Sequence, residues 1–307
     1  MKIFAAIAVG LLLGYALLAN LPAAEPVKDI AFYQSTSVQV IAHGNGRALL
    51  PGNTLEAAVN AIEVGTDILE LDIHLTADNQ LVVRHDDMID TTTNGSGLIA
   101  EMTLAEIQQY DVGFHKIDFP ELSYPPGIVV PTLESLFKRL PDSRYLIELK
   151  PLEIAPADYL CQLIRQRSLE KQVVIGSFHS SVLRYFRQVC PEVPTSLGQS
   201  EAFLLVALSR LGLSHLFSSP GVSVQLPVFF GGFEILTPAI IESAHQLNMR
   251  VEAWTVNEPE IMHKLINSRV DGIITDRPDI LRAILRLSLI HISDPRDRQK
   301  SRMPSSA

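Results

Sequence analysis

The stretch VQVIAH (38–43) is followed by TLEAAVNAIEV (54–64) and then by ILELDI (68–73). Two short apolar or β-branched runs flank a segment with helical periodicity, which is typical of a strand–helix–strand unit. The same alternation continues along the chain. Strands are expected at 38–43, 68–73, 145–150, 173–177, 195–197, 222–226, 250–255 and 272–275, and helices at 54–64, 133–140, 157–167, 181–189, 201–213, 238–247, 258–265 and 278–285.

Eight strand–helix units within about 250 residues predict a TIM (β/α)8 barrel at residues 38–286. An open doubly wound sheet is the alternative fold, but no GxGxxG motif follows the first expected strand. The third expected strand begins only at residue 145, far beyond the second. Residues 81–131 must therefore hold a hairpin and a small insertion after the second strand. Insertions of this length are usually functional or form a small subdomain.

The composition limits the classes of protein that the chain can represent. The 307 residues are 47% hydrophobic and 19% charged, with a net charge of −9, so an intrinsically disordered chain is excluded. The acidic balance argues against a nucleic-acid partner, because such proteins use Lys and Arg to neutralise phosphates. Cys161 and Cys190 are too few for a disulfide scaffold or a Cys-based zinc site, and we interpret them as buried small hydrophobic residues.

Both ends of the chain are expected to lie outside the barrel. Residues 1–24 place one lysine before an uncharged, mostly apolar run, which predicts a signal peptide or membrane anchor; a buried core helix is the alternative. Such a segment predicts that the chain is exported. The exported protein is expected either to stay anchored in the membrane by this segment or to be periplasmic or secreted. Residues 287–307 (LSLIHISDPRDRQKSRMPSSA) resemble translated sequencing-adapter DNA, which indicates a non-native tail; a natural polar tail is the alternative.

Acidic side chains interrupt two of the apolar strands. Glu70 and Asp72 stand two residues apart, so both point to one face, which in a barrel is the interior. Buried carboxylates repel one another unless a cation or a proton intervenes, and Mg²⁺ or Ca²⁺ prefers such oxygen ligands; an exposed edge-strand pair is the alternative. Glu148 is the candidate third ligand, and Lys150 on the same face could neutralise an anionic substrate, although a structural Glu148–Lys150 ion pair also fits.

Two histidines stand where strands end. His43 closes the first expected strand, and His85 follows the short apolar run LVV. Residues at the carboxyl ends of barrel strands face the active site. Because the pKa of histidine lies near neutrality, His43 and His85 could divide general-acid and general-base duty on a phosphate.

Seven strings, in order, resemble the glycerophosphodiester phosphodiesterase family: AHGNGRALLPGNTLEA, ELDIHLTADNQLVVRHDD, TTNGSG, VPTLES, IELK, WTVN and VDGIITDRPD. The resemblance covers residues 40–281. It implies a TIM barrel with a small insertion and divalent-metal-dependent hydrolysis of a glycerophosphodiester to glycerol 3-phosphate and an alcohol. By position, it assigns the metal to Glu70, Asp72 and Glu148, acid–base catalysis to His43 and His85, and a phosphate contact to Lys150. It also makes Trp254 an apolar wall of the substrate pocket, the alternative being an ordinary core aromatic.

Two positions depart from the family's pattern. Gly44 stands where the family usually has Arg, and Gly52 stands where it usually has Glu. In the family those two side chains lie close together, and the Arg also contacts the phosphate, so the paired loss is consistent with a coordinated change. Arg47 is a candidate substitute on the phosphate, with a solvated loop arginine as the alternative.

Two apolar stretches of the sequence could indicate which class of substrate the protein binds. Residues 202–217 are apolar over much of a helix, for which packing against neighbours is the simpler interpretation. PVFFGGF (227–233) follows the sixth strand and brings Phe229 and Phe230 to the active-site face, where they would suit an acyl chain or a membrane surface. We therefore expect deacylated glycerophosphodiesters as substrates and lysophospholipids as an extension. The rival is a weakly active or inactive barrel that binds phosphodiesters or anionic lipid.

Overall fold

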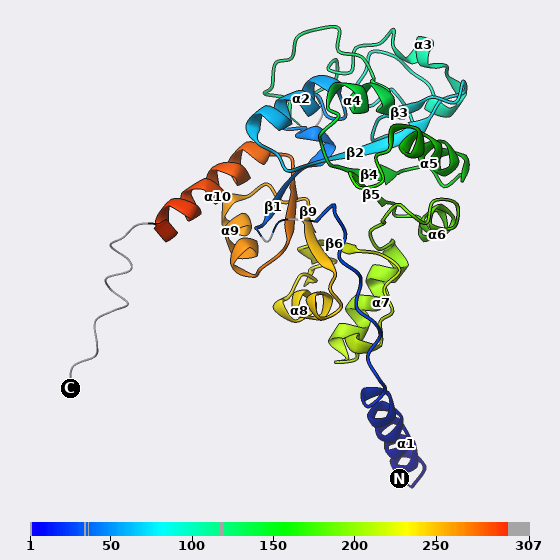
Figure 1. Cartoon of the computed structure of the whole chain (residues 1–307), viewed down its shortest axis with the longest axis vertical. Coiled ribbons are helices and arrows are strands. Elements are labelled where there is room, and N and C mark those ends of the chain that lie inside the picture. Colours follow the sequence, from blue (N-terminus) through cyan, green and yellow to red (C-terminus); the bar gives the residue numbers. More distant parts are fainter. Residues whose placement is uncertain (1, 34, 36, 117–118, 294–307) are drawn as a thin grey trace, which may run out of the picture.

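The predicted barrel is present. The computed structural model describes residues 2–33, 35, 37–116 and 119–293. Its main sheet has parallel neighbours in the order β5-β4-β2-β1-β10-β9-β6 (Figure 1). The strands are β1 (Gln39–Ala42), β2 (Ile68–Leu75), β4 (Tyr145–Leu149), β5 (Val173–Gly176), β6 (Ser223–Pro227), β9 (Arg250–Trp254) and β10 (Gly272–Thr275).

The fifth expected strand is reduced to two isolated parallel bridges. Thr195 pairs with Ile175 on β5, and Ser196 pairs with Ser223 on β6, so this short stretch joins the two edges of the sheet. It stays short because Pro194, which lacks an N–H, precedes it and a helix begins at Gln199.

Eight helices of the described chain alternate with the strands and surround the sheet (Figure 1). Three of them begin at a threonine whose side chain accepts a hydrogen bond from a first-turn N–H, as the Thr54 hydroxyl does from Ala57. The helices are α2 (Leu55–Val64), α4 (Leu133–Arg139), α5 (Ala155–Arg167), α6 (Ser180–Val189), α7 (Gln199–Arg210), α8 (Pro238–Gln246), α9 (Pro259–Asn267) and α10 (Pro278–Ser293).

The barrel interior contains an apolar layer next to the charged side chains of the expected site. Ile68 of β2 and Leu146 of β4 belong to an interior cluster with Phe32, a residue that precedes β1. Phe32 is buried, and its carbonyl accepts a 2.6 Å hydrogen bond from Arg144 Nη1. Period-two geometry then places the next inward side chains of β2 and β4 above this apolar layer. Those side chains are the acidic residues of the expected site.

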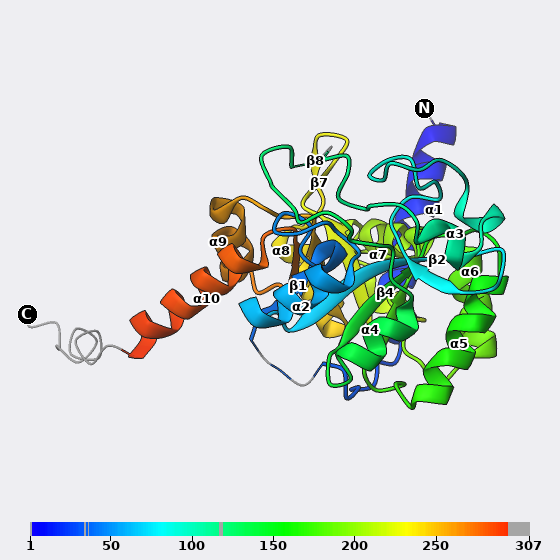
Figure 2. The ribbon, with the colours of Figure 1, turned by 90° about the horizontal axis from the view of Figure 1, so that it is seen from above.

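The insertion after β2 is a small subdomain with its own core. β3 (Leu81–Val83) pairs antiparallel with the end of β2, which confirms the expected hairpin, and α3 (Leu104–Ile107) follows. A separate apolar cluster stabilises the subdomain and comprises Val82, Ile89, Ile99, Ile107, Val112, Ile128 and Val130. The subdomain lies on the same side of the barrel as the hairpin of β7 (Phe229–Phe230) and β8 (Phe233–Glu234) (Figure 2).

The ends of the chain form helices in the described region. α1 (Lys2–Ala19) covers most of the expected leader, and α10 continues into the first residues of the suspected tail. Among the helices that the structure describes, none is both long enough and apolar enough to cross a membrane. The rest of the suspected tail, 294–307, lies outside the described residues.

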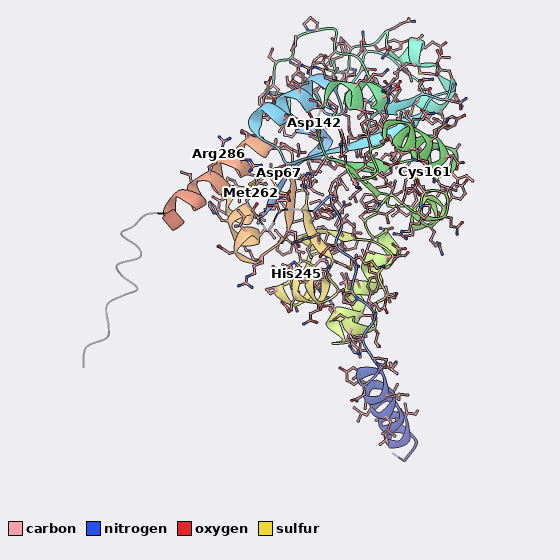
Figure 3. All side chains as sticks on the ribbon, viewed as in Figure 1. Asp67, Asp142, Cys161, His245, Met262 and Arg286 are labelled. Carbon is pink, nitrogen blue, oxygen red and sulfur yellow. A yellow bond between two sulfur atoms is a disulfide. The ribbon has the colours of Figure 1, made fainter. Side chains whose placement is uncertain are left out.

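The cysteines correct one expectation. Cys161 on α5 and Cys190, which follows α6, are buried as expected, but they form a disulfide rather than two free thiols. Figure 3 places Cys161 on the α5 side of the barrel. The sequence did not reveal the pairing because it depends on how α5 and α6 pack against each other.

Candidate active site

Three carboxylates meet inside the barrel near the carboxyl ends of β2 and β4. The parallel register pairs Asp72 directly with Glu148, and Glu70 lies one inward position below Asp72 on the same strand. One oxygen from each of Glu70, Asp72 and Glu148 lies within 4.8 Å of the other two. The structure therefore brings together the three side chains that the sequence proposed as metal ligands.

The cluster holds an excess of negative charge. Burial, followed by repulsion from the charge of Asp72, raises the pKa of both Glu70 and Glu148. Lys150 Nζ lies 3.5 Å from Asp72 Oδ1 and 3.3 Å from Glu148 Oε1, so the ion pair considered as an alternative is present. One ammonium cannot balance three carboxylates, of which Glu70 and Asp72 are buried and Glu148 is partly buried. Hard oxygen donors in this number fit a divalent cation.

The loop after β1 positions two of these carboxylates through hydrogen bonds. The backbone N–H of Gly44 donates to Glu70 Oε2 at 2.8 Å, and Gly44 has φ +50°, a left-handed conformation that favours glycine. The Asn53 side chain donates to Asp72 Oδ2 at 2.8 Å and accepts from the Asp72 N–H at 3.1 Å. Asn53 lies within a matching string but was not among the predicted site residues.

His43 is held by a carboxylate from the neighbouring strand. The register between β1 and β10 pairs Ala42 with Thr275, so the next residues, His43 and Asp276, lie side by side. Nδ1 of His43 is 2.6 Å from Asp276 Oδ1, and Asn257 Nδ2 donates to Asp276 Oδ2 at 2.7 Å. Burial opposes the charged imidazolium, but the bond to Asp276 and the nearby Glu70 charge outweigh it and raise the pKa of His43 to about 9.

Asp276 and Asn257 are functional candidates that the sequence reasoning missed. Both lie within matching strings, at the end of β10 and just beyond β9. Their position after a strand was the available signal, because residues at that end of a barrel strand face the site.

His85 repeats the arrangement of His43 on the insertion side of the site. Its Nδ1 lies 2.8 Å from Asp86 Oδ1, and its backbone carbonyl lies 3.1 Å from His74 Nε2. His85 also interacts electrostatically with Glu148, which places this histidine close to the carboxylates.

Arg47 occupies the space that side chains at the two departing positions would fill. A Cβ added to Gly52 would lie 2.7 Å from the Arg47 Cβ, and a Cβ added to Gly44 would lie 3.5 Å from the Arg47 Cδ. Arg47 Nε is 3.6 Å from Asp276 Oδ1. The two glycines and Arg47 thus form one packed unit beside the site, as a coordinated change requires.

The three aromatic candidates come from the end of β9 and from the hairpin after β6. Trp254 ends β9 and packs edge-to-face on Phe178, with ring centroids 5.6 Å apart. Phe229 and Phe230 form β7, and their side chains are 55% and 70% exposed. Phe233, on the paired strand β8, is 71% exposed, so the hairpin presents three phenylalanines to solvent.

A cavity of about 250 Å³ opens between the loop after β1 and the insertion. His85 and Asn53 line it, which makes it continuous with the site. Its wall also includes Arg47, Arg84, Thr92 and Tyr124.

Residues 43–280 match the family model described as the glycerophosphoryl diester phosphodiesterase family. The chain belongs to this family. YhdW of Bacillus subtilis strain 168, which carries the name of a glycerophosphodiester phosphodiesterase, is 33% identical over 248 residues, covering 79% of this chain and 96% of YhdW. The glycerophosphodiester phosphodiesterase of Caldanaerobacter subterraneus subsp. tengcongensis is 33% identical over 255 residues, covering 80% of this chain and 97% of that enzyme.

A solved structure supports the same assignment. A Silicibacter pomeroyi member of the glycerophosphoryl diester phosphodiesterase family superposes with a TM-score of 0.71 at 26% identity, covering 85% of this chain and 98% of that one. The resemblance found in the sequence and the expected barrel are therefore confirmed, and the chain is an enzyme of the glycerophosphodiester phosphodiesterase class.

Proposed function

We propose that this phosphodiesterase hydrolyses deacylated glycerophosphodiesters to glycerol 3-phosphate and an alcohol, with a divalent cation held by Glu70, Asp72 and Glu148. The observation that carries the proposal is the convergence of these carboxylates within 4.8 Å of one another. A phosphodiesterase from Oleispira antarctica with the same fold, 22% identical and with a TM-score of 0.65, was solved with sn-glycerol-3-phosphate as its product. That complex supports the proposed product.

The donor set fits Mg²⁺ or Ca²⁺, since both cations take carboxylate oxygens. A cation bound there would withdraw charge from the phosphoryl oxygens and so lower the barrier to attack at phosphorus. The chain orients its ligands for this role, because the Gly44 N–H and the Asn53 amide each hold one oxygen of a carboxylate.

We assign proton transfer to the Nε2 atoms of His43 and His85. In both rings Nδ1 is held by a carboxylate, at 2.6 Å by Asp276 and at 2.8 Å by Asp86, so Nε2 is the nitrogen left for substrate. A ring fixed in this way keeps one tautomer and one orientation. One histidine would protonate the leaving alcohol, and the other would accept a proton from the attacking water.

Lys150 and Arg47 are the proposed phosphate contacts. Lys150 lies between Asp72 and Glu148, where its ammonium can meet a phosphate bound at the carboxylates. Arg47 lines the cavity and reaches Asp276, so its guanidinium approaches the site from the opposite loop. Arg47 would take the place of the arginine that is absent at position 44.

Lysophospholipids are a second candidate substrate class, supported by the exposed hairpin of Phe229, Phe230 and Phe233. Large aromatic side chains favour the interface of a lipid bilayer. The human lysophospholipase D GDPD1 is 22% identical over 268 residues, covering 80% of this chain and 85% of the human protein. Contact with a membrane would bring such substrates to the rim of the barrel.

We also propose that the protein is exported, as the apolar residues 1–24 indicate. The Cys161–Cys190 disulfide supports this location, because disulfides persist in oxidising compartments. Protease accessibility in spheroplasts tests the proposal: digestion of the barrel supports export, and full protection contradicts it.

Hydrolysis of glycerophosphocholine, with Mg²⁺ or Ca²⁺ added back after EDTA, tests the main proposal. Glu148→Gln and Glu70→Gln should reduce activity and weaken metal binding measured by calorimetry, while Asp142→Asn, an exposed change, should do neither. Wild-type activity no higher than that of the variants would favour a non-catalytic binding barrel. Lysophosphatidylcholine in detergent tests the lipid candidate, and no turnover of it would contradict that candidate alone.

A further inference from the structure

Arg84 is a buried cation next to the active site. It follows β3, and its backbone N–H donates to the Asp72 carbonyl at 2.9 Å, which fixes its backbone beside Asp72 of β2. The residue is only 4% exposed. Among the described residues, its Nε and Nη2 atoms have no hydrogen-bond partner.

An unpaired buried guanidinium destabilises a folded protein, because its desolvation is not compensated by hydrogen bonds. Burial accordingly lowers the pKa of Arg84, and Asp86 offsets this only in part. Buried polar atoms are nearly always hydrogen-bonded, so two free donors on one guanidinium indicate a missing partner.

Arg84 lines the 250 Å³ cavity, and its two unpaired nitrogens are buried within the wall. Thr92 also lines it, and its buried Oγ1 likewise has no partner among the described residues. The lining includes the cations Arg47, Arg84 and Lys116 but one carboxylate, Asp86, whose Oδ1 is already bonded to His85. The cavity wall therefore combines excess positive charge with buried polar atoms that have no partner among the described residues, which is the chemistry of an anion site.

We propose that this cavity binds a second anionic group of the substrate, a carboxylate or a phosphate, in addition to the phosphate that is cleaved. The inference rests on the proposed function, because the cavity shares His85 and Asn53 with the catalytic site. Its size suits a compact charged group rather than an acyl chain. Arg84 and Thr92 would then select glycerophosphodiesters whose alcohol carries negative charge.

Two matched pairs of diesters test the proposal by calorimetry in EDTA, where binding is measured without turnover. Glycerophosphoserine differs from glycerophosphoethanolamine by a carboxylate, and glycerophosphoinositol 4-phosphate differs from glycerophosphoinositol by a phosphate. The wild type should bind the anionic member of at least one pair at least about tenfold more tightly. Arg84→Gln and Thr92→Val should each reduce that preference, whereas the exposed Arg184→Gln should retain it.

Equal affinity within both pairs, or a preference that survives Arg84→Gln, would overturn the proposal. Inorganic phosphate bound as tightly as the anionic diesters, and weakened equally by Arg84→Gln, would also overturn it, because the site would then take a free anion. A wild type that shows the preference but hydrolyses no diester would contradict only the proposed function.

Thermal stability separates this role from a structural one. Arg84→Met replaces an unpaired cation with an apolar chain of similar length, so we expect a higher Tm than that of the wild type without ligand. A lower Tm would show that Arg84 holds the fold together and would contradict the assignment.

Discussion

His43 Nδ1 lies 2.6 Å from Asp276 Oδ1, across two strands that meet only because the barrel closes β10 against β1. The first and last strands of the barrel thus jointly build the acid–base group of the proposed mechanism. Asn257 holds the second oxygen of Asp276, so the carboxylate has a fixed orientation of its own. A histidine held in this way presents one nitrogen to substrate.

Asp276→Asn is expected to lower kcat by about 100-fold, the scale of general acid–base catalysis. Asp276 accepts from both His43 and Asn257, and an amide, with a single oxygen, cannot accept both bonds in the same geometry. Steady-state kinetics with glycerophosphocholine measure the change, and circular dichroism checks that the fold is retained. A kcat within threefold of the wild-type value would show that Asp276 does not contribute to catalysis.

Gly52→Ala is expected to destabilise the protein by roughly 1–3 kcal/mol through overpacking. The new Cβ would lie 2.7 Å from the Arg47 Cβ, so one of the two must move. Arg47→Gly removes that atom, and the cost of Gly52→Ala should fall by more than half in its background. A double-mutant cycle in denaturant measures the coupling. Additive effects would show that Arg47 and Gly52 are independent.

Replacing Cys161 and Cys190 together with serine should lower the free energy of unfolding by roughly 2–4 kcal/mol. The disulfide joins α5 to the end of α6 across 29 residues, and neither cysteine lines the cavity or belongs to the carboxylate cluster. We therefore expect unchanged kcat at low temperature, with the loss visible in urea denaturation. Dithiothreitol should reduce wild-type stability and leave the double variant unaffected; equal sensitivity of both would contradict the assignment.

Glu252 should make stability depend on pH. It is buried in the barrel, where Tyr33 donates to it at 2.6 Å and Gln225 at 3.1 Å, and burial raises its pKa to about 7. The folded state therefore keeps a proton that the unfolded chain releases above about pH 4.5. The stabilisation is complete below that pH and is lost as pH rises toward 7, by roughly 3 kcal/mol.

The matched comparison for this effect is Glu252→Gln, which cannot titrate. The difference in unfolding free energy between wild type and variant, measured in urea from pH 4.5 to 8, should shift steadily in favour of the variant. A difference that does not change with pH would contradict a raised pKa at Glu252.

The sequence predicted those parts of the site that depend on local periodicity. Alternation within ILELDIHL was enough to place Glu70 and Asp72 on one interior face, and the same pattern placed Glu148. His43 and His85 were found because they follow short strands. The carboxylates that hold these histidines differ in how predictable they were. Asp86 directly follows His85 in the chain, whereas Asp276 is far from His43 in the sequence and becomes its neighbour only when the barrel closes.

Other features could not be predicted because they depend on packing between distant segments. Nothing in the spacing of Cys161 and Cys190 reveals that α5 and α6 bring them together. Residues 195–197 carry strand-forming residues but lie between Pro194 and a helix, so only isolated bridges form. Arg84 is next to a motif histidine in the sequence, yet its burial, and the cavity that it lines together with residues of the insertion, appear only in the folded chain.

The most direct test of the proposed mechanism follows glycerophosphocholine hydrolysis by ³¹P NMR in ¹⁸O-labelled water. With Mg²⁺ or Ca²⁺ present, we expect glycerol 3-phosphate that carries the label and unlabelled choline, with no turnover in EDTA. Turnover that is unaffected by EDTA, release of phosphocholine, or label in the choline would contradict metal-supported attack of water at phosphorus between the carboxylates and His43.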